Sequence, residues 1–407
     1  MDARSKMKPA FAQTQGGLFS AVAKADVGGS YLEMGKQGVA LMGWADPFYP
    51  DPALPPHVRK ALVDAIDTGF PAHYTPPIGD DELKAEIARK LKAFNHLDVD
   101  PKRNIIITPG SDAGLFFSIL PFVDRGDDIM IVDPSYPNNF QAVKLLGGNI
   151  IRVPLHEEDG FQPRIEEFEA RLTPATKAVI LTNPNNPTTT VFRRAFLEQL
   201  AAFAIEHDLI CIVDQAFEDS VFDDVEFVTL ASLPGMFERT VTVFSISKGM
   251  ALSGLRVGYI VADDKVMDTM YGCAVAVIGA TNTASQIAAA AAFRDSSFIA
   301  RYNEVFDRRR KMVCEIFAGV PGIRVQMPEA GFFCWVNVSA LGTGDEIAAR
   351  LMDERIAAVN GGSAYGEQGR DYIRIIHGSM GSDEQVRQAL EAIADFFRRL
   401  AAEKGIA

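Results

Sequence analysis

A lysine stands directly after an apolar, strand-like run, in the segment SISKGMALSGLRVGY of residues 245–259. An ammonium group at the end of a core strand is costly unless it is paired or loses its proton, so Lys248 is a candidate reactive amine. On the same segment Arg256, with the hydroxyls of Ser245 and Ser247, could hold a phosphate. The ordinary alternative for this arginine is a structural ion pair.

Two further polar groups follow predicted strands. Asp214 ends the run LICIVD, where a buried carboxylate needs a cationic partner or several donors. It could cap the next helix, or it could pair with a protonated ring nitrogen of a ligand. The turn TPGSDAG enters a helix through Gly110 and Ser111, where backbone N–H groups can bind an anion. Most such turns are merely capped helices, so this turn alone is a weak signal.

Arg374 lies in the strand-like run YIRIIHG and shares a face with Tyr372 and Ile376. Its guanidinium either reaches outward to solvent or binds a carboxylate with its fork of donors. Each of these polar groups alone favours an ordinary structural role. Together, a lysine, a phosphate site, a buried carboxylate and a carboxylate-binding arginine are the parts needed to hold pyridoxal phosphate and an amino acid.

Alternating strand-like and helical runs must position these groups. The runs at 104–108, 128–133, 177–183, 209–217 and 240–246 predict an α/β fold with a mostly parallel sheet buried on both faces. The clusters PGSDAG, DPSYPNN and NPNNPT follow these runs, at the strand ends where open α/β sheets bind ligands. The candidate residues should therefore converge at one edge of one sheet.

The pattern changes after about residue 290. One long helical run, the strand-like runs GFFCWVNV and YIRIIHG, and a final helix predict a smaller α+β domain. We therefore expect an N-terminal arm and joining segment over residues 1–45, a large domain over 46–290 and a small domain over 291–407. Residues 1 to about 25 are expected to form a loose arm.

Charge and composition exclude several classes of protein. The balance of 40 basic against 53 acidic residues gives a net charge of −13 without a basic stripe, which argues against nucleic acid and anionic membranes as partners. The four cysteines are scattered without metal-ligand spacing, so no metal site is expected. With neither a signal-peptide pattern nor a membrane-spanning apolar run, we expect a soluble cytoplasmic protein.

The segment around Lys248 resembles the lysine signature of the class I/II aminotransferases, a family of fold-type I pyridoxal-phosphate enzymes. SISKxxALxGLRVG fits that signature at every position, and the resemblance runs over nearly the whole chain. It implies pyridoxal 5′-phosphate as the cofactor and a homodimer with shared active sites. It also implies that Lys248 forms the Schiff base with the cofactor aldehyde and, when released, moves a proton from the substrate Cα.

The resemblance assigns further roles residue by residue. Asp214 would bind the protonated pyridine nitrogen, Asn186 would hydrogen-bond the 3′-oxygen, and Tyr136 would stack on the ring. Arg374 would bind the substrate α-carboxylate, which Gly43 would also approach. Tyr74 would reach the phosphate of the neighbouring subunit, and the chain's own phosphate site would consist of Gly110, Ser111, Asp112, Ser245 and Arg256.

The chain departs from the family pattern at several positions. Phe217, expected beside the cofactor, replaces the usual tyrosine that donates to the 3′-oxygen, and losing that donor should raise the pKa of the cofactor–lysine linkage. Thr189 replaces a glycine after Pro-Thr. In the stretch GGSAYG, Gly361 replaces a proline and Tyr365 a phenylalanine. These changes leave the reaction type more open than the cofactor.

The substrate is the least determined part of this interpretation. Dicarboxylate-specific relatives present a second arginine to the partner's site, but the corresponding stretch 271–285 has no lysine or arginine. We therefore expect an L-amino acid with a neutral or aromatic side chain and a 2-oxo acid, with Trp44 and Tyr365 as candidate pocket walls; both could instead be packing residues.

Three classes of function remain open. The first is an aminotransferase. The second is another reaction with the same cofactor, such as β-elimination, decarboxylation, racemisation or oxidation, which Phe217 keeps open. The third is a non-catalytic ligand-binding protein, which the complete set of site residues disfavours, because a binding module would not need Lys248.

Overall fold

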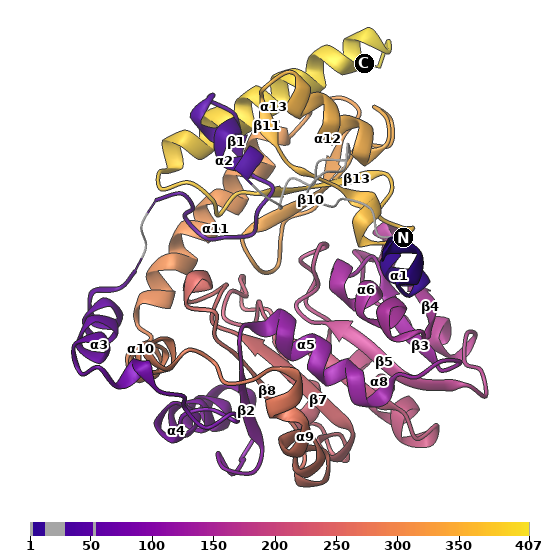
Figure 1. The fold of residues 1–407 in the computed structure, drawn as a ribbon. Coiled ribbons are helices and arrows are strands. Elements are labelled where there is room, and N and C mark those ends of the chain that lie inside the picture. Colours follow the sequence, from indigo (N-terminus) through magenta and orange to yellow (C-terminus); the bar gives the residue numbers. More distant parts are fainter. Residues whose placement is uncertain (1–2, 13–28, 52–53, 407) are drawn as a thin grey trace.

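The structure, a computed structural model, describes residues 3–12, 29–51 and 54–406. Its largest element is a seven-stranded sheet with the order β2-β8-β7-β6-β5-β3-β4 (Figure 1). The strands are β2 (Ile105–Thr108), β3 (Asp128–Asp133), β4 (Asn149–Pro154), β5 (Thr176–Thr182), β6 (Ile210–Asp214), β7 (Thr240–Ser245) and β8 (Gly258–Val261). Only β8 runs antiparallel to its neighbours in this sheet.

Helices cover both faces of this sheet, which explains why its strands are apolar at consecutive positions. In β3, Met130 and Val132 face one core cluster, whereas Ile129 and Ile131 face another. The first face is covered by α7 (Ile165–Glu169), α8 (Arg194–Glu206), α4 (Asp81–Lys90) and α10 (Thr283–Arg294). The second is covered by α5 (Ser111–Ile119), α6 (Pro137–Leu146) and α9 (Asp264–Val277). We call these strands and helices the large-sheet unit.

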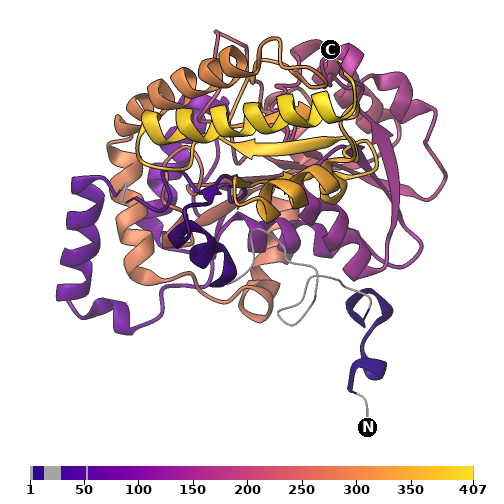
Figure 2. The ribbon, with the colours of Figure 1, turned by 90° about the horizontal axis from the view of Figure 1, so that it is seen from above.

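A second, antiparallel sheet has the order β12-β13-β10-β9 and forms the upper part of Figure 1. Its strands are β9 (Arg324–Val325), β10 (Phe333–Asn337), β12 (Asn360–Gly361) and β13 (Tyr372–Ile376). They pack with α11 (Phe298–Phe317), α12 (Gly344–Asp353) and α13 (Asp383–Glu403), and α13 lies beside α11 (Figure 2). We call this second assembly the small-sheet unit.

The N-terminal part of the chain reaches the small-sheet unit. Strand β1 (Ala40–Leu41) pairs in parallel with β11 (Ala357–Ala358), and α2 (Gly29–Lys36) packs beside β1. Helix α3 (Pro56–Asp67) then packs against α10. A short 3-10 helix (Ala3–Lys6) and α1 (Pro9–Ala12) lie at the edge of the molecule, near α6 (Figure 2).

The predicted α/β architecture is confirmed, and three details differ. Strand β8 was not predicted, because GYIV begins inside the lysine segment. The run expected at 209–217 ends as a strand at Asp214, where the chain turns toward the cleft. Two short helices occupy residues 3–12 of the expected loose arm, and residues 13–28 lie outside the described part. The domain boundaries near residues 45 and 290 stay predictions. No described helix is both long and apolar enough to cross a bilayer.

Candidate active site

A cleft of about 570 Å³ lies where the large-sheet strands end, with residues of the small-sheet unit on its other side. It gathers most of the side chains that the sequence singled out. These are Gly43, Trp44, Ser111, Asp112, Tyr136, Asn186, Asp214, Phe217, Lys248, Arg256, Tyr365 and Arg374. Gly110, Ser245 and Tyr74 are not among its lining residues.

Lys248 lies in the turn after β7, and its ammonium group has no carboxylate within ion-pair distance among the described residues. Its Nζ donates to the backbone carbonyl of Ala45 at 2.8 Å. Burial lowers the pKa of this amine, while the nearby carboxylates of Asp112, Asp46 and Asp214 partly oppose the shift. A lowered pKa leaves a larger fraction of the amine unprotonated near neutral pH, the form in which it is a nucleophile.

Asp214 ends β6 and is almost fully buried, with only 5% of its surface exposed. Its Oδ1 accepts from the N–H of Ala216 at 3.0 Å, and burial raises the pKa of the carboxyl from 3.8 to about 7. The second oxygen, Oδ2, has no hydrogen-bond partner among the described residues. A protonated ring nitrogen in the cleft would supply that partner and stabilise the carboxylate.

A cup of donors lies where α5 begins. Gly110 has φ of +88°, and a Cβ there would lie 2.3 Å from Nη2 of Arg256, so glycine lets the guanidinium approach the helix N-terminus. Ser111 and Ser247 also line the cleft. Ser245 stays a predicted phosphate ligand: its Oγ accepts from the N–H of Ser247 at 3.1 Å, which leaves the hydroxyl proton to donate. The helix start, two hydroxyls and a guanidinium can together bind a phosphate.

Tyr136 reaches the cleft from the start of α6. Its hydroxyl donates to Oδ1 of Asp112 at 2.8 Å, and Asn138 Nδ2 donates to the same oxygen at 2.9 Å. Burial, and then the charge of Asp112, raise the pKa of the Tyr136 phenol well above its usual value. The phenol therefore stays protonated, and the bond to Asp112 fixes where its ring lies.

Phe217 lines the cleft as an apolar wall. Its ring contacts those of Phe332 and Phe333 edge-on, with centroids 5.7 and 5.0 Å apart. Phe217 has no hydroxyl, so its side chain offers no hydrogen-bond donor to the cleft. Asn186 is a remaining donor, because its Oδ1 is used by Arg374 while its Nδ2 stays available.

Arg374 is buried, with 6% of its surface exposed, and it has no acidic partner among the described residues. It donates to Asn186 Oδ1 at 3.0 Å, to Asn360 Oδ1 at 2.9 Å and to the Gly43 carbonyl at 3.4 Å. Its Nε is buried without a partner. A buried guanidinium held only by neutral acceptors is a binding site for an anion.

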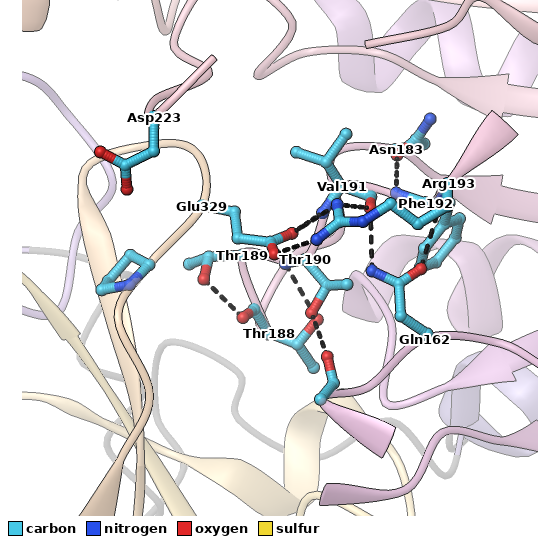
Figure 3. A network of polar contacts seen from close by, with 12 residues as sticks. Gln162, Asn183, Thr188, Thr189, Thr190, Val191, Phe192, Arg193, Asp223 and Glu329 are labelled. Carbon is cyan, nitrogen blue, oxygen red and sulfur yellow. Dashed lines mark hydrogen bonds and ion pairs between the residues drawn. The ribbon is translucent and has the colours of Figure 1, made fainter. Parts of the chain in front are cut away.

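The loop that carries Asn186 has a strained backbone and is held by hydrogen bonds from a residue of the small-sheet unit. Thr189 has φ of +65°, a costly conformation for a β-branched residue. Figure 3 shows Glu329 from the small-sheet unit reaching this loop. Its Oε2 accepts from the N–H of Val191 at 2.9 Å and from Arg193 at 3.0 Å. This network holds the loop in the conformation that points Asn186 into the cleft.

Trp44 stands at the cleft entrance, with 42% of its surface exposed. Its ring packs against Tyr31 at 6.0 Å and Tyr49 at 5.4 Å. The Tyr31 hydroxyl accepts from the N–H groups of both Gly43 and Trp44 at 3.1 Å. This tyrosine, which the sequence interpretation missed, fixes the turn that Gly43 and Trp44 form.

Tyr74 is 92% exposed and lies away from the cleft of its own chain. Val63 and Ile66 of α3 and Phe70 just after this helix are also exposed. We call these four exposed residues the apolar stripe. Among the described residues, no group of histidine, cysteine and acidic side chains is arranged to hold a metal ion.

Comparison with known proteins places this geometry in one family. The family model described as aminotransferase class I and II matches residues 40–393. An aspartate aminotransferase of Pyrococcus abyssi is 34% identical over 373 residues, covering 90% of this chain and 94% of that protein. The aromatic-amino-acid aminotransferase 2 of Thermococcus litoralis is 33% identical, covering 88% of this chain and 92% of that protein.

Solved structures agree with this placement. The aromatic aminotransferase of Pyrococcus horikoshii superposes with a TM-score of 0.84 at 31% identity, covering 92% of this chain and 99% of that chain. The aspartate aminotransferase of Thermus thermophilus with maleate gives 0.82 at 28% identity, covering 91% and 94%. Both substrate names therefore occur among similar proteins.

Proposed function

Because the chain belongs to the class I and II aminotransferases, which use pyridoxal 5′-phosphate, we propose that it moves the amino group of a neutral or aromatic L-amino acid to a 2-oxo acid. One observation carries the proposal: Arg374, a buried arginine with no acidic partner in the described part of the chain, lines the same cleft as Lys248. The first group binds a carboxylate and the second reacts as an amine. An amino acid substrate requires both.

The cleft residues fit the cofactor. Asp214 offers a buried carboxylate with one free oxygen, and Arg256 with Ser111 and Ser247 offers a phosphate cup. Bound pyridoxal phosphate supplies an electron-accepting ring that stabilises negative charge at the substrate Cα. Asp214 would keep the ring nitrogen protonated, and the Nδ2 group of Asn186 would donate to the 3′-oxygen.

Lys248 has two tasks in this proposal. Its amine would hold a bound cofactor covalently, and its lowered pKa favours the nucleophilic form that this requires. When not so linked, the same amine would accept the proton of the substrate Cα. Arg374 holds the α-carboxylate throughout, so that the Cα proton stays within reach of Nζ.

The basic residues that line the cleft support a substrate with a neutral or aromatic side chain. The basic residues that line it are Lys248, Arg256 and Arg374, and each already has a role toward cofactor or α-carboxylate. The remaining carboxylate of Asp46 would repel a second substrate carboxylate. Trp44 and Tyr365 provide apolar walls. An acidic side chain on the substrate therefore lacks a partner within the described residues, whereas an aromatic one can pack.

The apolar stripe of Val63, Ile66, Phe70 and Tyr74 supports a homodimer as part of the same proposal. Four large exposed apolar side chains within twelve residues favour burial against another surface. Pairing two copies over this stripe would carry Tyr74 toward the phosphate cup of the neighbouring subunit. The active site would then draw residues from both chains.

A half-reaction screen tests the proposed activity. The holoenzyme is mixed with phenylalanine, leucine or aspartate, without an oxo acid, and the cofactor spectrum is recorded. We expect conversion with phenylalanine or leucine at a kcat/KM at least about tenfold above that for aspartate, and recovery of the spectrum on adding a 2-oxo acid. Faster conversion of aspartate would contradict the substrate class. Ammonia release without recovery by an oxo acid would favour elimination, which Phe217 keeps open as a second candidate.

A further inference from the structure

Asp133 ends β3 but does not line the cleft, and none of the roles above uses it. Its carboxylate is buried, with 1% of its surface exposed. Arg152 of β4 donates to its Oδ2 at 2.8 Å. The other two donors belong to the small-sheet unit: the N–H of Glu367 reaches Oδ2 at 2.9 Å and the N–H of Gln368 reaches Oδ1 at 3.1 Å.

These two N–H groups belong to residues 365–368, which we call the latch loop. Gly366 lies directly on the carboxylate: with φ of +130°, a Cβ there would be 2.0 Å from Oδ1 of Asp133. The N–H of Ser135, two residues after Asp133, donates to the Tyr365 carbonyl at 2.8 Å. Both ends of the latch loop are thus hydrogen-bonded to residues at the end of β3. A glycine at position 366 is needed because a side chain there would clash with the Asp133 carboxylate.

The latch loop also carries a wall of the cleft. The Tyr365 ring lies 5.0 Å from the guanidinium carbon of Arg374, and Phe333 lies 5.4 Å from the same carbon. Trp335 packs edge-on against Tyr365, with centroids 5.5 Å apart. The guanidinium of Arg374 therefore contacts two aromatic rings. One of them belongs to Tyr365, whose backbone is in the loop that Asp133 holds.

We propose that Asp133 is a positioning residue for the substrate carboxylate: by holding the latch loop, it places Tyr365 against Arg374 and so sets the affinity of that arginine for the carboxylate. This inference rests on the proposed function only in taking Arg374 as the carboxylate site. The Asp133 carboxylate accepts from two backbone N–H groups of the other unit. Such charge-assisted hydrogen bonds hold a loop in place more strongly than neutral ones, so this side chain is suited to positioning the latch loop.

Two variants approach the contact from its two sides. Asp133→Asn keeps the size of the side chain but turns an NH₂ group toward one of the two N–H donors, which releases the latch loop. Gly366→Ala leaves Asp133 intact and drives a Cβ into its Oδ1. In both variants we expect faster amide hydrogen exchange over residues 365–368, with exchange in the large-sheet strands unchanged.

The binding readout uses 3-phenylpropionate, a carboxylate without an amino group, titrated calorimetrically into the holoenzyme. For both variants we expect its Kd and the KM for the amino donor to rise about tenfold or more, with kcat within about twofold of wild type. Glu157→Gln is the matched control. Glu157 also joins the two units, through Arg324, Asn337 and Tyr372, but it does not touch the latch loop. The Kd of 3-phenylpropionate for Glu157→Gln should therefore equal that for the wild type.

The inference is overturned if the Kd of 3-phenylpropionate stays within about twofold of wild type in both variants, since Asp133 would then serve stability alone. It is also overturned if Glu157→Gln weakens carboxylate binding equally. Failure of the proposed function gives a different result: no amino transfer by the wild type. Hydrogen exchange and carboxylate binding still test the role of Asp133 in that case.

Discussion

The guanidinium of Arg374 donates a hydrogen bond to the side-chain carbonyl of Asn186 at 3.0 Å. Arg374 belongs to β13 of the small-sheet unit, and Asn186 belongs to the loop after β5. This bond therefore joins the two sides of the cleft. We propose that the arginine binds the substrate carboxylate and that the asparagine binds the cofactor 3′-oxygen. Because the arginine occupies the carbonyl, the Nδ2 group of Asn186 is left to donate a hydrogen bond, as the proposed role requires.

Restoring the missing phenol should change the holoenzyme spectrum. Phe217→Tyr adds a donor beside the 3′-oxygen, which favours the deprotonated linkage, so we expect the pKa of the Lys248–cofactor linkage to fall by about one to two units. The measurement is a pH titration of the visible absorbance. Phe217→Leu, which also lacks a hydroxyl, is the control and should titrate like the wild type. An unchanged transition in Phe217→Tyr would show that another donor already serves the oxygen.

Asp214 should make the cofactor-free protein less stable as the pH rises. Burial raises the pKa of its carboxyl from 3.8 to about 7 in the folded chain, so the folded state binds the proton more tightly than the unfolded state. The stability that this proton provides is complete below about pH 4 and is lost as the pH rises to about 7, with an upper limit of about 4 kcal/mol.

The matching variant is Asp214→Asn. Without cofactor it should match the wild type at pH 4 and exceed it in free energy of unfolding at pH 8, as measured by urea denaturation. The same variant should lose turnover, because an amide does not keep a ring nitrogen protonated. Equal stability of the two proteins at pH 8 would mean that the buried carboxylate is satisfied without a ligand.

The backbone at Thr189 favours glycine. Its φ of +65° costs the folded state about 1–2 kcal/mol, and glycine would relieve that strain. Glycine also makes the unfolded chain more flexible and removes side-chain contacts, and these losses offset the gain. The free energy of unfolding of Thr189→Gly should therefore stay within about 1 kcal/mol of wild type. Thr188→Gly is the matched control at ordinary φ. The Thr188 hydroxyl accepts from Asn185 at 2.9 Å, and its removal should cost about 2 kcal/mol. Thermal unfolding measures both changes; the reverse order would refute strain at Thr189.

The apolar stripe on α3 gives a prediction about assembly. Ile66 is 58% exposed, so Ile66→Glu should not disturb the fold of one chain but should break a dimer that buries this face. Sedimentation velocity should then show a monomer, with activity reduced because Tyr74 no longer reaches the other site. Asp64→Asn is the control and should remain dimeric, because Asp64 is one position from Val63 and two from Ile66, spacings that do not share a helix face. A monomeric wild type would refute the shared site.

How far the sequence predicts this molecule depends on whether a feature is local. Strand β3 matches its predicted limits because an apolar run is bounded by polar turn residues, and Lys248, Asp214 and Arg256 lie in short segments with a recognisable pattern. Strand β8 was missed because its four residues begin inside the lysine segment without a separate boundary. Ser245 and Ser247 are two residues apart, and only the turn decides which hydroxyl faces the cleft.

The contacts that complete the site are long-range and carry no local signal. Asn360 reaches Arg374 because β12 pairs with β13, and Tyr31 reaches Gly43 across the turn before α3. Asp133 lies more than 230 positions from the amides it binds, and an aspartate after a strand is common in any α/β protein. Such partners depend on how segments distant in sequence pack together, which a single sequence does not record.

The central claim is a covalent bond between Lys248 and pyridoxal phosphate, and reduction measures it most directly. The purified holoenzyme is treated with borohydride, digested, and analysed by mass spectrometry. We expect the peptide containing Lys248 to carry the reduced cofactor. We also expect Lys248→Ala to bind pyridoxal phosphate but to lose it on denaturation. A label on another lysine, or no label on a protein that still transfers amino groups, would contradict the account.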